Sequence, residues 1–181
     1  MKNSVRKFFT SVITISMLAT IPVQAAEVQE MILSENALEQ ENGLLSAGTE
    51  SAKDTVTSLE RSSIVSSASS EIIDETGGNI GVIIQTLCHV ECEEIRNMAI
   101  LERLNEETNS WEEQARYDFK AVKEDFPTTE LTSLTNSFTI ENQKTGYYYR
   151  IRGIHSVTTP DGKGQVYSTR TDGLLITEYG R

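Results

Sequence analysis

The sequence predicts an all-β fold for residues 80–181, an antiparallel β-sandwich of about six to seven strands. Two observations carry this prediction. Apolar and polar residues alternate along several short segments, so each segment has one face to bury and one face to expose to water. Turn-forming residues separate the segments, as at residues 159–164, where proline presets φ and glycine tolerates positive φ. A stretch of this length supports one globular domain.

Residues 147–157 show the clearest alternation. The face that we expect to be buried carries Tyr147, Tyr149, Ile151 and Val157. The opposite face carries Tyr148, Arg150, Arg152 and Ser156. Aromatic and β-branched residues suit a pleated, half-buried surface, so this segment is predicted to be a strand with one core face.

Five further segments have strand patterns: residues 80–87, 95–104, 111–119, 134–140 and 165–177. Residues 95–104 are apolar on both sides, which suits a central strand and leaves a short buried helix as the alternative. Trp111 shares its parity with Tyr117 and Phe119, so we expect it on the core face. The face assignment of the last segment shifts near Gly173, which indicates a bulge. Residues 62–73 would supply a seventh strand.

The N-terminus has the pattern of a secretory signal peptide. Three basic residues at positions 2–7 precede the largely apolar residues 8–21, and Val23-Gln24-Ala25 supplies small residues for cleavage after Ala25. The apolar run is too short for a comfortable membrane span. We therefore expect residues 1–25 to be removed and the product to be secreted into the extracellular space.

Residues 26–79 differ in composition from the rest of the chain. They contain 11 acidic residues against two basic ones, several runs of serine, and no aromatic residue. Such a segment buries too little apolar surface to offset the entropy lost on ordering. We expect a disordered spacer or a propeptide here, closed by Gly77-Gly78, with the β-domain following over residues 80–181.

The charge of the chain excludes some partner classes. The net charge is −11, and removal of residues 1–25, which hold three of the 16 basic residues and none of the 27 acidic ones, leaves −14. Such a surface repels phosphate backbones and anionic lipids. We expect no nucleic-acid partner, no membrane association after signal cleavage, and a monomeric protein.

The turn and strand at Gly146–Ile151 resemble the E-to-F corner of fibronectin type III and immunoglobulin-like sandwiches. In those folds a tyrosine near the start of strand F returns its hydroxyl to the backbone a few residues upstream. By spacing, the resemblance assigns this role to Tyr149. It concerns the fold and implies no function.

Four blocks of the sequence carry a second resemblance: LERLN at 101–105, TNSW at 108–111, GYYYRIRGIHS at 146–156 and TDG at 171–173. Together they resemble a family of small secreted Gram-positive proteins. The family combines a signal peptide, a variable spacer and a β-rich C-terminal domain of uncharacterised function. The resemblance covers most of residues 80–177 and is absent before residue 80. It implies an extracellular β-domain and no particular reaction.

Cys88 and Cys92 are the two thiols of the chain. An even cysteine count in a secreted protein favours a disulfide. In a straight strand the two residues would lie about 13 Å apart, beyond the roughly 4.4–6.8 Å that a disulfide requires between Cα atoms. Residues 88–92 must therefore turn if the bond forms, and free or intermolecular thiols remain the alternatives.

The sequence offers no catalytic constellation, so we expect no enzyme activity, cofactor or metal. A zinc site built on Cys88, His89 and Cys92 lacks a second ligand pair at a recognisable spacing. His155 continues the buried parity of residues 149 and 151, and His89 is the one other histidine of the chain. We interpret His155 as a hydrogen-bonded, half-buried histidine at a strand end rather than a catalyst.

With no catalytic pattern in the sequence, binding of another molecule is the function that we consider next. Tyr148, Arg150 and Arg152 share the non-core face of one strand, and Arg170 is expected nearby on the adjoining strand. Tyrosine and arginine are enriched at binding hot spots. Our hypothesis is a secreted, non-enzymatic β-domain that binds an extracellular protein or glycan. The alternatives are a solvated, purely structural face, a secreted peptide precursor, and an enzyme with an unrecognised site.

Overall fold

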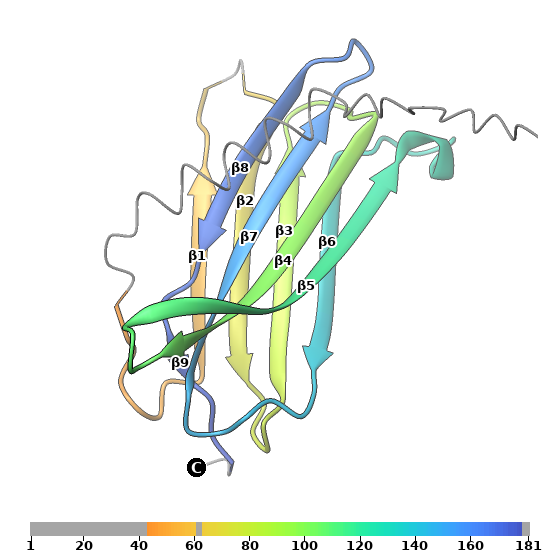
Figure 1. Ribbon diagram of the computed structural model, residues 1–181. Helices are drawn as coiled ribbons and strands as arrows, with labels where there is room; N and C mark the ends of the chain where they lie inside the picture. Colours follow the sequence, from red (N-terminus) through yellow and green to blue (C-terminus); the bar gives the residue numbers. More distant parts are fainter. Residues whose placement is uncertain (1–42, 61–62, 179–181) are drawn as a thin grey trace, which may run out of the picture. The chain divides into compact units, whose positions relative to one another are not determined.

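Two antiparallel sheets pack face to face in the structure, a computed structural model that describes residues 43–60 and 63–178 (Figure 1). The predicted signal peptide, residues 1–25, lies outside the described residues. Among the described residues, every pairing between the strands β1 to β9 is antiparallel, and one isolated parallel bridge joins Leu44 to Gly173. The predicted all-β sandwich is therefore confirmed, and residues 95–104, for which a buried helix was the alternative, lie within a strand.

Sheet 1 contains, in spatial order, β1 (Ser51–Thr57), β2 (Val65–Asp74), β3 (Ile80–Cys88) and β6 (Ser133–Ile140). Sheet 2 contains, in spatial order, β5 (Ser110–Val122), β4 (Glu94–Asn105), β7 (Tyr148–Thr158) and β8 (Gly164–Arg170). A short β9 (Leu174–Leu175) pairs with the start of β7, and the 3₁₀-helix η1 (Lys123–Asp125) follows β5. The single strand expected over 165–177 is thus divided into β8 and β9.

The predicted boundary of the domain at residue 80 is wrong. Two strands, β1 and β2, lie inside the segment expected to be a disordered spacer. The inward side chains of β2 include Ala68 and Ile72, which are completely buried. The sequence offered β2 only as an optional seventh strand over residues 62–73, because its four serines resemble those of a disordered segment, although Ser69 and Ser70 are themselves buried. The folded domain therefore begins at β1 or earlier.

Two apolar clusters fill the space between the sheets. The larger one is centred on Ile72, Leu101 and Tyr149, and the smaller one contains Ile95 and Val157. At the edge formed by β5 and β6, the Phe138 ring lies 4.8 Å from that of Tyr117. At the opposite edge, a carboxylate oxygen of Asp54 accepts a hydrogen bond from the backbone N–H of Arg170 at 2.7 Å. Both edges of the sandwich are thereby tied together.

A polar network around His155 crosses the interior. Asn97 donates its amide to the carbonyl of Leu134 at 3.1 Å, so its Oδ1 is an acceptor, and Thr86 donates to this Oδ1 at 2.6 Å. Thr86 therefore accepts from His155 Nδ1 at 2.9 Å, and His155 Nε2 accepts from Thr169 at 2.9 Å. This order assigns the histidine proton to Nδ1. Burial lowers the pKa of His155 to about 4.

Gly153 makes room for this network. A Cβ atom at this position would lie 2.1 Å from Ser70 Oγ, 2.5 Å from Thr169 Oγ1 and 2.9 Å from His155 Nε2. Ser70 and Thr169 are themselves hydrogen-bonded at 2.6 Å. The hydroxyl chain thus passes through space that only glycine leaves open. His155 is satisfied as predicted, although it is completely buried rather than half-buried.

Tyr149 forms the predicted tyrosine corner. Its side chain is 1% exposed, and its hydroxyl donates a hydrogen bond to the backbone carbonyl of Lys144 at 3.1 Å. Lys144 lies in the connection by which the chain crosses from β6 in sheet 1 to β7 in sheet 2. This is the position of the E-to-F corner in immunoglobulin-like sandwiches.

The predicted core position of Trp111 is wrong. The pairing of β4 with β5 places Leu101 opposite Ala115 but Glu102 opposite Glu113, so one residue of β5 is extra. This bulge reverses the parity of the residues before it, because successive side chains of a strand point to opposite faces. Trp111 therefore lies on the outer face of sheet 2, while Tyr117 keeps its predicted core face.

Candidate functional site

The predicted binding residues share one face, as expected, but they are not an exposed patch. Tyr148, Arg150 and Arg152 all lie on the outer face of sheet 2, and Arg170 of β8 pairs with Arg152 in the strand register. Tyr148 is half-buried, whereas Arg150 is 6% and Arg152 is 4% exposed. The exposure assumed for the two arginines is therefore wrong.

Glu102 of β4 holds both arginines. Arg150 Nε donates to one carboxylate oxygen of Glu102 at 2.7 Å, and Arg152 Nε donates to the other at 2.9 Å. The register explains this arrangement, because Glu102 lies directly opposite Arg150, and Arg152 is the next residue on the same face. Nη1 of Arg152 is buried and has no hydrogen-bond partner among the described residues. The sequence analysis missed Glu102.

Two arginines of this region also stack on aromatic rings. The guanidinium carbon of Arg150 lies 4.3 Å from the centre of the Trp111 ring. That of Arg103 lies 5.3 Å from the centre of the Tyr147 ring. Both distances fall within the range of a cation–π contact. Tyr147 was predicted to face the core, but it precedes β7 and is 41% exposed.

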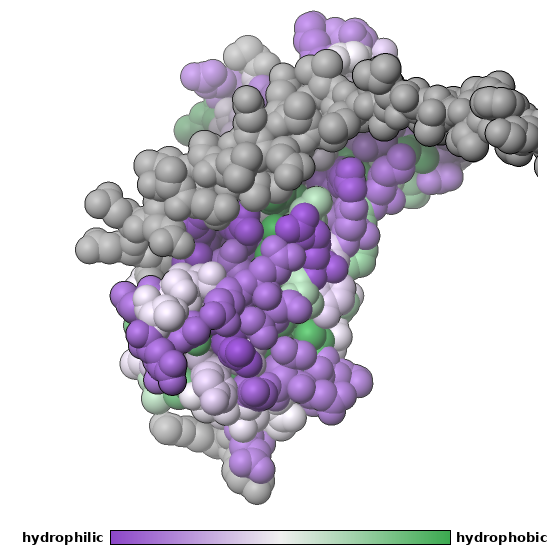
Figure 2. Space-filling model, viewed as in Figure 1, coloured by the Kyte–Doolittle hydropathy of each residue, from purple (hydrophilic) through white to green (hydrophobic). Residues whose placement is uncertain are grey.

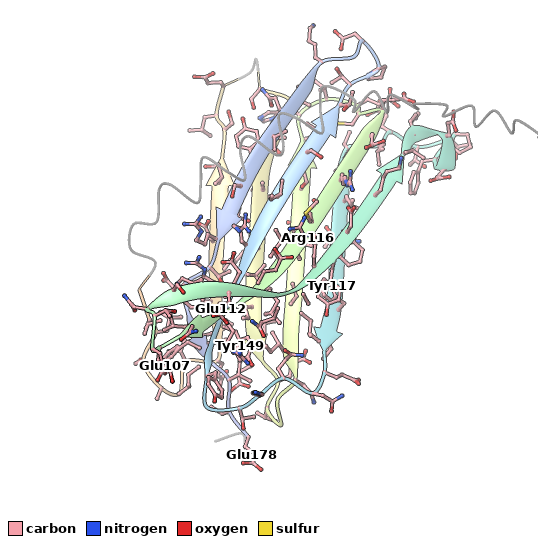
Figure 3. All side chains as sticks on the ribbon, viewed as in Figure 1. Glu107, Glu112, Arg116, Tyr117, Tyr149 and Glu178 are labelled. Carbon is pink, nitrogen blue, oxygen red and sulfur yellow. The ribbon has the colours of Figure 1, made fainter. Side chains whose placement is uncertain are left out.

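Ion pairs cover the rest of the outer face of sheet 2 along β5. They join Arg96 to Asp118, Lys120 to Glu94, and Arg116 to Glu113. Figure 2 shows hydrophilic residues gathered over this side of the sheet, and Figure 3 labels Glu112 and Arg116 along β5. The charged groups of this face are largely engaged with one another. Exposed pairs of this kind contribute little to stability.

The outer face of sheet 1 is chemically different. Strand register places sixteen residues there in four rows, each row crossing β1, β2, β3 and β6. We call this surface the hydroxyl face, and its rows are Ser51, Ile73, Gly81, Thr139; Lys53, Glu71, Ile83, Ser137; Thr55, Ser69, Gln85, Thr135; and Thr57, Ser67, Leu87, Ser133. Nine of the sixteen are serine or threonine, so neutral hydrogen-bonding groups dominate.

The hydroxyl face is open to solvent at both of its edges. Every outward residue of β1 and β6 is exposed, and Gln85 near the centre is half-buried. The side-chain amide of Gln85 donates to the hydroxyl of Thr135 at 2.8 Å. The two charged members, Lys53 and Glu71, pair with each other at 3.7 Å. The Glu75 carboxylate also lies on this face beside Gly81, and it accepts a hydrogen bond from the Thr139 hydroxyl at 3.0 Å. The face is thus mainly hydroxylic and carries one further carboxylate at the end that contains Thr139. The sequence analysis missed the face because its residues come from four strands.

The two cysteines lie side by side without a bond between them. Residues 88–92 form the turn that a disulfide requires. The N–H of Cys88 donates to the carbonyl of Thr132, and that of Cys92 to the neighbouring carbonyl of Leu131, each at 2.8 Å. A hydrogen bond between the thiols, together with burial, raises the pKa of Cys88, and the same bond lowers the pKa of Cys92. Within residues 43–60 and 63–178, no group of three or more His, Cys, Asp or Glu side chains could hold a metal ion.

No protein-family model and no curated protein sequence matches this chain. Among the residues that the structure describes, no helix is long and apolar enough to cross a membrane. The site must therefore be interpreted from its own chemistry.

Proposed function

We propose that this chain is an exported, non-enzymatic β-sandwich that binds a neutral extracellular glycan through the hydroxyl face. One observation carries the proposal: nine serine or threonine residues and one glutamine share an outer sheet face on which Lys53 pairs with Glu71, and the Glu75 carboxylate lies at one end, held by Thr139. Each hydroxyl can donate and accept a hydrogen bond, as the hydroxyls of a sugar do. The Glu102 cluster is less suited to recognition, because its arginines are buried and already paired.

Charge favours a neutral ligand over an anionic one. Without residues 1–25 the chain has a net charge of −14 and repels acidic polymers at long range. The hydroxyl face adds no positive patch that would offset this repulsion. Its hydrogen-bonding groups recur about every 5 Å across the strands and about every 7 Å along them. An extended saccharide chain can follow such an array over several residues.

A glycan array with neutral and acidic saccharides tests this function. We expect retention of neutral oligosaccharides by the wild type and at least a tenfold loss of affinity for Gln85→Glu, which introduces a charge at the centre of the face with almost no change in shape. Gln114→Glu, at the exposed bulge of β5, is the matched control and should bind as the wild type does. Binding to acidic saccharides alone, or equal binding by Gln85→Glu, contradicts the proposal. Capture of a protein ligand instead would favour the protein-binding alternative.

We also propose that the chain is exported and loses residues 1–25. The pattern of residues 1–25 supports a cleaved signal peptide, and the four resembling sequence blocks support a secreted Gram-positive origin. In an oxidising compartment, Cys88 and Cys92 would each lose a proton and together transfer two electrons to a thiol oxidant, forming one S–S bond. The exported product should begin at Ala26 and gain about 2 Da on reduction, in agreement with the two added hydrogens. An unchanged mass excludes the internal disulfide.

The fold argues against the alternative in which residues 26–79 are released as a peptide, because this segment contains β1 and β2. Release of residues 26–79 would remove β1 and β2 from sheet 1, leave β3 as an edge strand, and uncover the inner residues of β7 and β8 that pack against β2. A carrier domain of residues 80–181 alone would therefore lose half of one sheet. A mass corresponding to residues 80–181 in the exported fraction would revive this alternative.

A further inference from the structure

The strand β6 ends sheet 1 without a neighbour on its outer side. It pairs with β3 from Ser133 to Ile140, and among the described residues no other strand pairs with it (Figure 1). The N–H of Cys88 donates to the carbonyl of Thr132, which makes the even-numbered residues of β6 the ones hydrogen-bonded to β3. The odd-numbered residues, Ser133 to Thr139, therefore direct their N–H and C=O groups toward the open edge.

This edge lacks the features that normally prevent strand addition. Proteins protect edge strands with charged residues, proline, bulges or short length. The edge strand β5 has a bulge and five charged residues, and β1 carries Lys53 and Asp54. By contrast, β6 has eight residues in unbroken register, no charged residue and no proline. Two acidic chains can approach each other here without bringing like charges into contact.

The sequence of β6 is complementary to itself. A two-fold axis at Asn136 places Ser133 opposite Thr139, and Thr135 opposite Ser137, so hydroxyls meet hydroxyls on the outer face. On the inner face, Leu134 then lies opposite Phe138. The hydrogen-bonded pairs in this register are odd with odd, which are the residues whose backbone groups point to the open edge. A two-fold interface requires this kind of self-complementarity.

We propose that β6 pairs antiparallel with β6 of a second copy of this chain, joining two copies of sheet 1 into one eight-stranded sheet. Leu134 and Phe138, which are half-buried in the single chain, gain an apolar neighbour across the two-fold axis. The hydroxyl face doubles in width. This inference stands apart from the proposed glycan ligand and departs from the monomer expected from the sequence.

Sedimentation equilibrium of the mature chain, residues 26–181, tests the proposal. We expect the wild type to dimerise reversibly as its concentration rises. Thr135→Lys brings two ammonium groups to the strand pair and should raise the dissociation constant of the dimer at least tenfold. Thr55→Lys, on the same face but on β1, is the matched control and should dimerise as the wild type does.

A second variant acts on the backbone alone. The N–H of residue 137 faces away from β3, so Ser137→Pro removes a hydrogen bond between copies but none within sheet 1. Circular dichroism checks that each variant retains its β-structure. Loss of the dimer in Thr135→Lys and Ser137→Pro but not in Thr55→Lys supports the proposal. A wild type that stays monomeric at its highest soluble concentration overturns it, as does a dimer that persists in both β6 variants.

Discussion

The outer faces of the two sheets differ in the charge and in the solvent exposure of their polar side chains. On sheet 2, one carboxylate, that of Glu102, is held between two buried guanidinium groups, and one of these also stacks on Trp111. On the hydroxyl face of sheet 1, small neutral side chains are exposed along both edge strands. The charged and aromatic groups of sheet 2 are therefore less accessible to a ligand than the neutral hydroxyl groups of sheet 1. Residue type alone is a poor guide to a binding face, because burial and pairing decide which groups can meet a ligand.

The largest effect should come from removing the shared carboxylate of sheet 2. Glu102→Gln removes the carboxylate that both Arg150 and Arg152 contact, and we expect a loss of about 3–5 kcal/mol in the free energy of unfolding. Urea denaturation measures this loss. Glu113→Gln removes the partner of Arg116 in an exposed pair, and it should cost less than about 1 kcal/mol. Equal losses in the two variants would contradict the contrast between the buried and exposed pairs.

A substitution in the buried polar network around His155 should lower the stability nearly as much. Gly153→Ala inserts a Cβ atom 2.1 Å from Ser70 Oγ, and we expect a loss of roughly 2–3 kcal/mol in the free energy of unfolding. In a Ser70→Ala background the added loss should be smaller, because the nearest obstructing atom is absent. A double-mutant cycle measured by urea denaturation provides this comparison. Strict additivity would show that the clash does not involve Ser70.

A smaller effect should appear on acidification. Burial lowers the pKa of His155 from its ordinary value of 6.5 to about 4, so the unfolded chain binds a proton at a higher pH than the folded one. The contribution of neutral His155 to the free energy of unfolding is present in full above pH 6.5, and it is lost as the pH falls toward 4. The loss between pH 6.5 and 5 should be roughly 1.5 kcal/mol.

Two histidine variants separate this effect from the titration of carboxylates. His155→Gln should be less stable at neutral pH and should lack the histidine part of the pH dependence. His89→Gln, at an exposed position, should retain it. Free energies of unfolding measured from pH 7 to pH 5 give both slopes. If the free energy of unfolding of His155→Gln depends on pH as steeply as that of the wild type, His155 is not the source of this pH dependence.

The smallest effect on stability should come from the hydroxyl face itself. Thr55 is exposed on the edge strand β1, and its Thr55→Ala variant should change the free energy of unfolding by no more than about 0.5 kcal/mol. The same substitution should weaken glycan binding, because it removes a hydrogen-bonding group from the face. Thermal denaturation together with a binding titration measures both quantities. A large loss of stability would mean that the face is structural.

Much of the fold was predictable because its signals are local. Alternation predicted β7 and its two faces, and the resemblance to the E-to-F corner of immunoglobulin-like sandwiches predicted the hydroxyl contact of Tyr149. The strand β2 was predicted only as an optional seventh strand over residues 62–73, because its serines resemble those of a disordered segment, although Ala68 and Ile72 face the core. The face of Trp111 was predicted wrongly because a bulge in β5 leaves no local signal in the sequence.

The site was predictable only in part because it depends on register between strands. Parity correctly placed Arg150 and Arg152 on one face. Their burial depends on Glu102, which is 48 residues from Arg150 in the sequence and becomes its neighbour only through the pairing of β4 with β7. The hydroxyl face is assembled from four strands in the same way. No single segment contains enough of it to be recognised.

The most direct test of the account is to map bound glycan by NMR. Backbone and side-chain chemical shifts are followed while a neutral oligosaccharide retained on the array is titrated into a chain of residues 26–181. The account predicts that the largest shift changes cluster at the hydroxyl face, around Ser69, Gln85 and Thr135. Changes concentrated instead at Tyr148, Arg150 and Arg152 would contradict it and assign recognition to sheet 2.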